Sequence, residues 1–338
     1  MSTLNDLSVL PLPAGPALNA DETDNHLSLT LEGQPLVRLR LERSEELHVH
    51  LQDASHVAPA RALWAASYWL FVKEPARQRL VWHLEHVAED ALRSGLLVAS
   101  EEIAGQFHCE RTQFWQLPEP WLGQSPSGSY PQHMIISAGK RHPARAPKPR
   151  GEVYRRFDAR LGAWISLRTV EIDVDLARFN RWQNSPRVAS FWQESGSLEQ
   201  HREYLDKLEA DPHTLTLIGC LDDEPFAYFE AYWAKEDRIA PFYDAADYDR
   251  GVHMLVGEEH HRGPHKVASW LSALVHYLFL DDPRTQRVVA EPRADNAKMI
   301  GHMQNQCFHC EKEFDFPHKR AALMILGRER FFDRCGLV

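Results

Sequence analysis

A glycine turn with basic residues on both sides lies between an apolar strand and an amphipathic helix in the second half of the chain. Residues 252–256 form a short apolar segment. Arg262 and Gly263 follow in a polar turn, and Lys266 stands at the start of the helix. A helix N-terminus offers free N–H groups and the positive end of its dipole, and the two basic side chains add charge. This order predicts a phosphate-binding turn.

His253 lies on the strand before that turn. A neutral imidazole near physiological pH could accept a proton from an incoming amine or hydroxylamine. A strand histidine is also a common packing residue, so residue type and position alone leave both interpretations open.

Three further histidines, His260, His261 and His265, crowd the turn. His261 and His265 have the i, i+4 spacing of a metal-binding pair, but Arg-Gly-Pro between them belongs to a turn and Arg262 would repel a dication. We therefore expect phosphate hydrogen bonding here and no metal. Residues 307–310 form a C-x-x-C sequence without a second cysteine pair at zinc-ribbon spacing, which favours ordinary thiols.

Apolar residues at i, i+3, i+4, i+7, i+8 and i+11 predict the helix after the turn. They are Val267, Trp270, Leu271, Leu274, Val275 and Leu278. A second predicted strand, residues 286–291, returns beside the first and ends in Glu291-Pro292.

This order of elements resembles the acyl-CoA-binding half of the GNAT acyltransferases, and more closely the branch that serves siderophore biosynthesis. The resemblance covers residues 165 to 330. It rests on ordered short motifs: Phe229-Glu230-Ala231-Tyr232-Trp233, Tyr243-Asp244-Ala245, Gly251-Val252-His253, Arg262-Gly263 and Glu291-Pro292 with Asp295-Asn296. His265 and Val267 replace two small residues of the family's phosphate loop, so pyrophosphate contacts would depend more on Arg262, Lys266 and helix amides.

The resemblance implies a catalytic pair. His253 would be the general base or orient the substrate, and Glu291, where the branch carries an acidic residue, would be its partner or an amine anchor. Backbone N–H groups near Val256 and Gly257 would stabilise the oxyanion. Asp295 would cap the next helix, with Asn296 contacting the pantetheine arm.

Two larger sets of contacts follow from the same resemblance. The expected cofactor contacts are Val256, Gly257, Arg262, Gly263, His265, Lys266 and Asn296. The expected substrate contacts are Glu230, Tyr232, Trp233, Tyr243 and Asp244, although aromatic residues at such positions are also common core residues.

The composition is that of an ordinary globular protein with room for two domains or one large one. The 338 residues are 43% hydrophobic and 25% charged. A net charge of −10 argues against nucleic acid as a partner. The sequence has no apolar run of membrane-spanning length and no signal-like N-terminus. Five scattered cysteines suit reduced thiols, and we expect a cytoplasmic protein.

The expected fold class is α+β, with four segments. Residues 1–28 form a loose arm, 29–122 a small α+β domain, 123–150 a Pro-rich basic linker, and 151–338 a GNAT domain with a mixed, mostly antiparallel sheet and flanking helices. The first domain repeats the strand–helix order without an Arg-Gly turn. It is therefore either a degenerate GNAT-like half or an unrelated lid or dimerisation domain.

The function implied by the resemblance is transfer of an acyl group from acetyl-CoA or another acyl-CoA, without a metal. The acceptor would be N-hydroxylysine, N-hydroxyornithine or a hydroxylated diamine, and the product a hydroxamate. Two alternatives stay open: a GNAT enzyme for another small amine, and a non-catalytic acyl-CoA-binding protein. The sequence leaves monomer and homodimer undecided.

Overall fold

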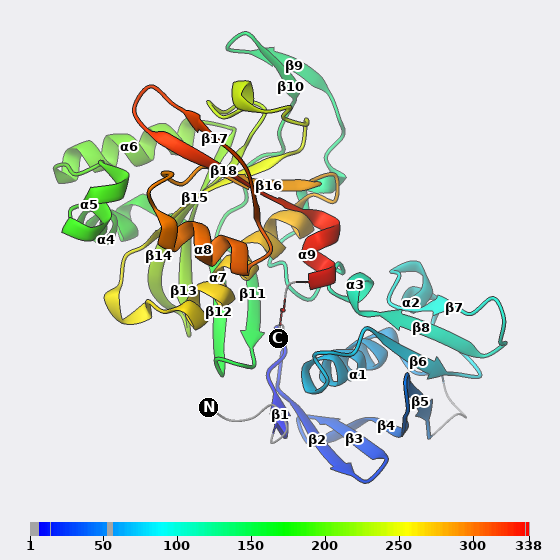
Figure 1. Ribbon diagram of the computed structural model, residues 1–338. Helices are drawn as coiled ribbons and strands as arrows, with labels where there is room; N and C mark the ends of the chain where they lie inside the picture. The colour runs from blue at the N-terminus through cyan, green and yellow to red at the C-terminus, as the bar shows by residue number, and fades with distance from the viewer. Residues whose placement is uncertain (1–6, 14, 53–56, 335, 338) are drawn as a thin grey trace. The chain divides into compact units, whose positions relative to one another are not determined.

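The chain forms two compact units (Figure 1). The computed structural model describes residues 7–13, 15–52, 57–334, 336 and 337. Unit 1 comprises Met1–Trp121, Arg156–Ala163 and Gly336–Val338, and unit 2 comprises Leu122–Arg155 and Trp164–Cys335. Segments 156–163 and 336–338 therefore belong with the first unit, although they lie far along the chain.

Unit 1 is a mixed sheet with one long helix. The strand order is β1-β2-β3-β4-β5-β6-β8-β7, and only β5 and β6 run parallel. Helix α1 makes the crossover that a parallel pair requires. The elements are β1 (Val9–Leu10), β2 (Leu18–Thr23), β3 (His26–Leu31), β4 (Gln34–Arg43), β5 (Leu47–Leu51), α1 (Ala60–Lys73), β6 (Arg79–His83), α2 (Glu89–Arg93), β7 (Val98–Ala99), β8 (Gln106–Glu110) and α3 (Arg111–Phe114).

The loose arm expected for residues 1–28 is wrong from Val9 onward. Strands β2 and β3 pair antiparallel, and Leu18, Leu27 and Leu29 are buried in the core of the unit. The sequence gives only a weak strand signal at β2, because this strand has one buried residue and its other side chains are polar or small. Residues 1–6 and 14 lie outside the described residues.

Unit 2 carries the predicted strand, turn, helix and strand. The order of its large sheet is β11-β12-β13-β14-β15-β16-β18-β17, and β15 and β16 are its parallel pair. Helix α7 joins them. The elements are η2 (Ser127–Ser129), β9 (Met134–Ser137), β10 (Lys140–Pro143), β11 (Glu152–Asp158), β12 (Ala163–Thr169), α4 (Ile172–Gln183), α5 (Pro186–Trp192), α6 (Leu198–Ala210), β13 (Thr214–Leu221), β14 (Glu224–Trp233), η3 (Ala240–Phe242), β15 (Arg250–Val256), η4 (Glu259–His261), α7 (Pro264–Asp281), β16 (Arg287–Ala290), α8 (Ala297–Asn305), β17 (His309–Asp315), β18 (Arg320–Gly327) and α9 (Arg328–Arg334).

The two large sheets have the same strand order. Each runs through antiparallel strands to one parallel pair bridged by a helix, and each ends with its last two strands in exchanged order. The difference lies before the third strand, where unit 2 inserts α4, α5 and α6 and unit 1 has only the turn at Asp24 and Asn25. This topology supports a GNAT-like first half that lacks those three helices.

The basic segment 123–150 is packed on unit 2 and is not a free linker. It contains the β9–β10 hairpin, and the Arg145 guanidinium, almost fully buried, pairs with Glu236 at 2.5 Å and lies 4.1 Å from the ring of Trp233. Lys140 and Lys148 donate to backbone carbonyls of unit 2. The three basic side chains therefore interact with groups of unit 2, against which the Pro-rich segment packs.

Strands β15 and β16 separate after a short parallel pairing, and the centre of unit 2 lies at this point of separation. Their parallel pairing consists of Arg250 with Val288 and Gly251 with Val289, after which the ladder ends. Helix α7 begins at Pro264 after Gly263, whose φ of 143° suits glycine, and residues 269–281 are all buried. Within the described residues, no helix is long and apolar enough to cross a membrane.

Gly251 is predicted to be required for packing. A Cβ there would overlap the ring of Tyr232, which is 1% exposed, so Gly251→Ala should destabilise unit 2 by about 1–3 kcal/mol through overpacking. Urea unfolding monitored by tryptophan fluorescence measures this. The matched control is Gly301→Ala in α8, where a Cβ meets nothing within 4 Å and a gain of about 0.5–1 kcal/mol is expected. Equal stability of the two variants would contradict the close approach at Gly251.

Candidate active site

A histidine held between two carboxylates lies where β15 and β16 part. The register of β14 and β15 sets Glu230 opposite His253, and the ring Nδ1 is 2.7 Å from Glu230 Oε2. Glu291 follows the end of β16, and its Oε1 is 2.6 Å from the ring Nε2. We call Glu230, His253 and Glu291 the bracket.

Tyrosine hydroxyls hold the two carboxylates in place. Tyr204 on α6 and Tyr228 on β14 donate to Glu230 Oε1 at 2.5 and 2.9 Å, and Tyr232 donates to Glu291 Oε2 at 2.6 Å. Both carboxylates are buried, at 4% and 2% exposed, so these bonds replace the water they have lost.

The bracket is a charged group at neutral pH. Burial disfavours charge on His253, but Glu291 and Glu230 outweigh it and raise the pKa of His253 to about 10. Burial likewise opposes the charge on Glu291, yet the imidazolium lowers the pKa of Glu291 to about 2 and also lowers that of Glu230. One cation between two anions gives a net charge of −1.

The neutral, available base expected at His253 stays a prediction, and the geometry favours a protonated ring instead. Both ring nitrogens face a carboxylate, so in the imidazolium both N–H groups donate and neither nitrogen has a free lone pair. A proton accepted at this site would therefore involve the carboxylates as well as the ring.

The structure brings two of the five expected substrate residues to the bracket. Glu230 is part of it, and the ring of Tyr232 lies 4.8 Å from that of His253. Trp233 points to the other face of β14, where the guanidinium groups of Arg145 and Arg250 each lie 4.1 Å from its ring. Side chains alternate along a strand, so Trp233 cannot share the face of Tyr232.

Tyr243 and Asp244 belong to a segment held by its own polar contacts. The Tyr243 hydroxyl donates to Asp249 at 3.1 Å, and Arg287 pairs with Asp249 and donates to the Asp244 carbonyl. The Asp244 side chain is exposed. Tyr243 also packs against the hydrophobic cluster that contains Tyr232, and neither residue has a hydrogen bond to the bracket among the described residues, so their substrate role stays a prediction.

The predicted oxyanion donor at Gly257 is wrong in this structure. The Gly257 N–H donates to the Phe226 carbonyl at 2.8 Å, which continues the pairing of β15 with β14. Arg187 donates to the carbonyls of Val256 and Gly257. Gly257 is required for a different reason, because an added Cβ would overlap the ring of Trp182.

The first turn of α7 retains the features of an anion site. Within the described residues, the N–H groups of His265 and Lys266 have no acceptor, and no acidic residue stands in that turn. Arg262 pairs with Glu259 at 2.7 Å, and Lys266 donates to the His260 carbonyl at 2.9 Å. Both side chains would have to exchange these partners to meet a phosphate.

Asn296, and not Asp295, caps helix α8. Its side-chain oxygen accepts from the Met299 N–H at 3.2 Å, while Asp295 pairs with Arg293 at 2.6 Å. The expected N-cap was one residue too early. The amide nitrogen of Asn296 and the second lone pair of its oxygen are left for a cofactor.

Sequence reasoning named Glu230 and Tyr232 as substrate contacts but missed Tyr204, Tyr228 and Arg238, which also lie around the bracket. Tyr228, Glu230 and Tyr232 alternate along one strand, and this period-two spacing was a usable sign that they share a face. Tyr204, on a helix that precedes the strand pair, carried no such sign. Arg238 was also missed, and its guanidinium lies 3.8 Å from Glu291 Oε1 with the side chain 51% exposed.

The equivalent positions of unit 1 hold no carboxylate. Counting from the first parallel pair of each sheet, the bracket positions correspond to Arg40, His50 and His83. His50 and His83 stack at 4.2 Å, and burial together with the neighbouring histidines lowers the pKa of His83. This arrangement cannot hold an imidazolium between anions.

We predict that His253 stays doubly protonated at pH 8. Because its pKa is raised in the fold, the stabilisation it provides is complete below its ordinary pKa of about 6.5 and is lost as pH rises toward about 10. The ring 15N chemical shifts should show two protonated nitrogens at pH 8. The difference in thermal midpoint between wild type and His253→Gln should shrink from pH 6 to pH 10. A neutral ring at pH 8 would contradict the geometry.

Residues 171–316 match the acetyltransferase (GNAT) domain family. The chain is 46% identical over 229 residues to the N(6)-hydroxylysine O-acetyltransferase of Escherichia coli, covering 67% of this chain and 72% of that protein. It is 41% identical over 251 residues to the hydroxyornithine transacylase SID3 of Ajellomyces capsulatus, covering 66% and 57%.

Among solved structures, an uncharacterised protein of Bacillus halodurans superposes with a TM-score of 0.52 and 29% identity, covering 54% of this chain and 93% of that one. The sequence matches and the strand–turn–helix–strand core agree on one assignment. The chain belongs to the GNAT acyltransferases, in the branch that contains the hydroxylysine and hydroxyornithine acyltransferases.

Proposed function

We propose that the protein transfers an acyl group, acetyl in the simplest case, from acyl-CoA to an N-hydroxylated side-chain amine. The acceptor is a hydroxylated lysine, ornithine or diamine, and the product is a hydroxamate for a siderophore. The observation that carries this proposal is the bracket at the point where β15 and β16 part. Relatives named for hydroxylysine and hydroxyornithine support the acceptor class.

Acyl-CoA binding fits the region beside the bracket. Past Gly251 the edge of β15 is no longer paired with β16, so its backbone groups are available to the amides of a pantetheine arm. The free N–H groups at the start of α7 suit the pyrophosphate. Gly263 and Lys266 are therefore proposed cofactor contacts, with Arg262 joining them on exchange from Glu259.

A net charge of −1 suits the chemistry of a hydroxylamine. This nucleophile is weakly basic and arrives neutral, so its nitrogen can attack the thioester carbon while its proton passes to the bracket. The C–S bond then breaks, and the departing thiolate takes up the proton that the bracket received, which gives free CoA and restores the bracket. The bracket can accept one proton without acquiring a positive charge. Its carboxylates have lowered pKa values, which suits the strongly acidic nitrogen formed by the attack, so the proton acceptor is the group of three residues and not His253 alone.

The first experiment measures CoA release from acetyl-CoA with N6-hydroxylysine, N5-hydroxyornithine, N-hydroxycadaverine and their unhydroxylated parents. Turnover should be confined to the hydroxylamines, and the ferric complex of the product should absorb as a hydroxamate, which distinguishes N-acylation from O-acylation. Glu291→Gln, which keeps the shape and removes one charge of the bracket, should lower kcat by roughly 100-fold.

A surface glutamate provides the matched control. Glu311→Gln on β17 removes a charge of the same type from an exposed strand and should leave kcat unchanged. Turnover of unhydroxylated amines would favour a GNAT enzyme for another small amine. Tight binding of acetyl-CoA without turnover on any acceptor would favour a binding protein.

Arg238 is proposed to select acceptors that carry a carboxylate. Its exposed guanidinium lies beside Glu291 without a close hydrogen bond, whereas Lys319 is fixed on the Glu291 carbonyl at 2.7 Å. The buried carboxylate of Asp249 is paired with Arg287 and is not available to the distal ammonium of a diamine. Free positive charge next to the bracket favours an amino-acid acceptor over a diamine.

Arg238→Gln should raise KM for N6-hydroxylysine by about tenfold and leave KM for N-hydroxycadaverine within twofold, because only the first has a carboxylate. Steady-state kinetics with both acceptors tests this in one preparation. Arg202→Gln, which removes a half-exposed arginine paired with Asp173, is the control. An equal change in KM for both acceptors would exclude carboxylate recognition by Arg238.

A further inference from the structure

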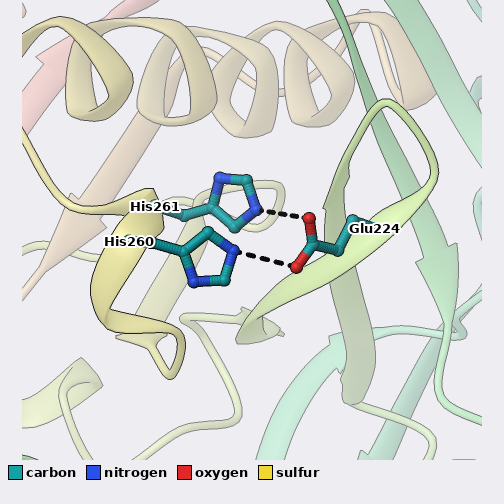
Figure 2. Close-up of side chains that lie close together, drawn as sticks. All are labelled: Glu224, His260 and His261. Atoms are coloured by element: carbon teal, nitrogen blue, oxygen red, sulfur yellow. Dashed lines mark hydrogen bonds and ion pairs between the residues drawn. The ribbon is translucent and has the colours of Figure 1, made fainter.

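Two adjacent histidines and a glutamate gather beside the turn that precedes α7 (Figure 2). Glu224 is the first residue of β14, and His260 and His261 belong to the short turn η4. Glu224 Oε1 is 2.9 Å from His260 Nε2, and Oε2 is 3.1 Å from His261 Nε2. The sequence favoured no metal here, because Arg-Gly-Pro forms a turn and Arg262 would repel a dication, but the fold sets a carboxylate beside two of the histidines.

The three side chains present a set of donors that suits a metal ion. One ligand atom from each residue lies within 4.8 Å of the other two, and imidazole nitrogen with carboxylate oxygen is a donor set for late first-row divalent ions. We propose that Glu224, His260 and His261 form a binding site for a Zn2+-class divalent ion. This inference does not depend on the proposed acyl transfer.

The state of His261 is a second, independent observation. This residue is only 8% exposed and its ring packs 5.5 Å from that of Phe226, so its direction is fixed. Its buried Nε2 has no hydrogen bond of acceptable geometry within the described residues, although it points at Glu224. A buried polar atom without a hydrogen bond is costly, and a metal ion between His261 and Glu224 would satisfy it.

The nearest basic side chain, Lys266, can move aside when a metal ion binds. Lys266 Nζ lies 3.2 Å from His261 Nδ1 and 2.9 Å from the His260 carbonyl. Metal at Nε2 requires the ring proton on Nδ1, so Lys266 would release the ring and keep the carbonyl. The guanidinium of Arg262 is already paired with the carboxylate of Glu259. The ion and the Lys266–His261 hydrogen bond are therefore mutually exclusive.

Zn2+ binding by calorimetry tests the site, with the ion itself as the probe. The full chain carrying Cys310→Ser removes an exposed thiol that could also bind Zn2+. Glu224→Gln and His260→Ala, both at exposed positions, should weaken binding at least about tenfold or remove one equivalent. Lys266→Met should strengthen it several-fold, because the competing ammonium is gone.

The matched control is His309→Ala, which removes an exposed histidine paired with Glu311 outside the cluster and should change nothing. Visible absorption of bound Co2+ gives a second readout, which should be present in the wild type and absent in Glu224→Gln. Identical Zn2+ stoichiometry and affinity in wild type, Glu224→Gln and His260→Ala would overturn the proposal. Weaker binding in Lys266→Met would also contradict it.

Discussion

One imidazolium held between two carboxylates is the interaction on which the centre of unit 2 depends. Burying a net negative charge is costly, and the fold offsets it with three tyrosine hydroxyls and with the basic groups of Arg238 and Lys319. The bracket draws together β14, β15 and the residue after β16, while α6 contributes Tyr204. A site that needs four elements in register is rigid, which suits the proton exchange proposed for it.

The parallel pair β15 and β16 has two opposing tasks. It must pair closely enough to set His253 against Glu291, and it must part soon enough to leave an open edge. The ladder ends after two pairs, two residues before the bracket on each strand. Helix α7 keeps the strands in this arrangement because its last thirteen residues are all buried. The same helix then presents its N-terminus, free of acidic residues, beside the open edge.

Unit 1 shows that this strand order can exist without the two carboxylates of the bracket. It repeats the strand order and the helix-bridged parallel pair, but lacks the three helices that unit 2 inserts before its third strand. Where unit 2 has two carboxylates, unit 1 has an arginine and a second histidine. The fold is therefore a scaffold, and the charge pattern on one strand face decides whether it can be a catalytic site.

Local periodicity in the sequence determined the strand, turn, helix and strand around Gly263, and family motifs selected His253 and Glu291. Alternation along β14 also carried the information that Tyr228, Glu230 and Tyr232 share a face and that Trp233 does not. Only the tertiary structure decided that Glu230 completes the bracket, that Phe226 takes the Gly257 N–H, and that Arg145 is buried against Glu236. The physical reason is that spacing encodes the face on which a side chain lies. The partner that lies opposite depends on strand register and on segments tens of residues away.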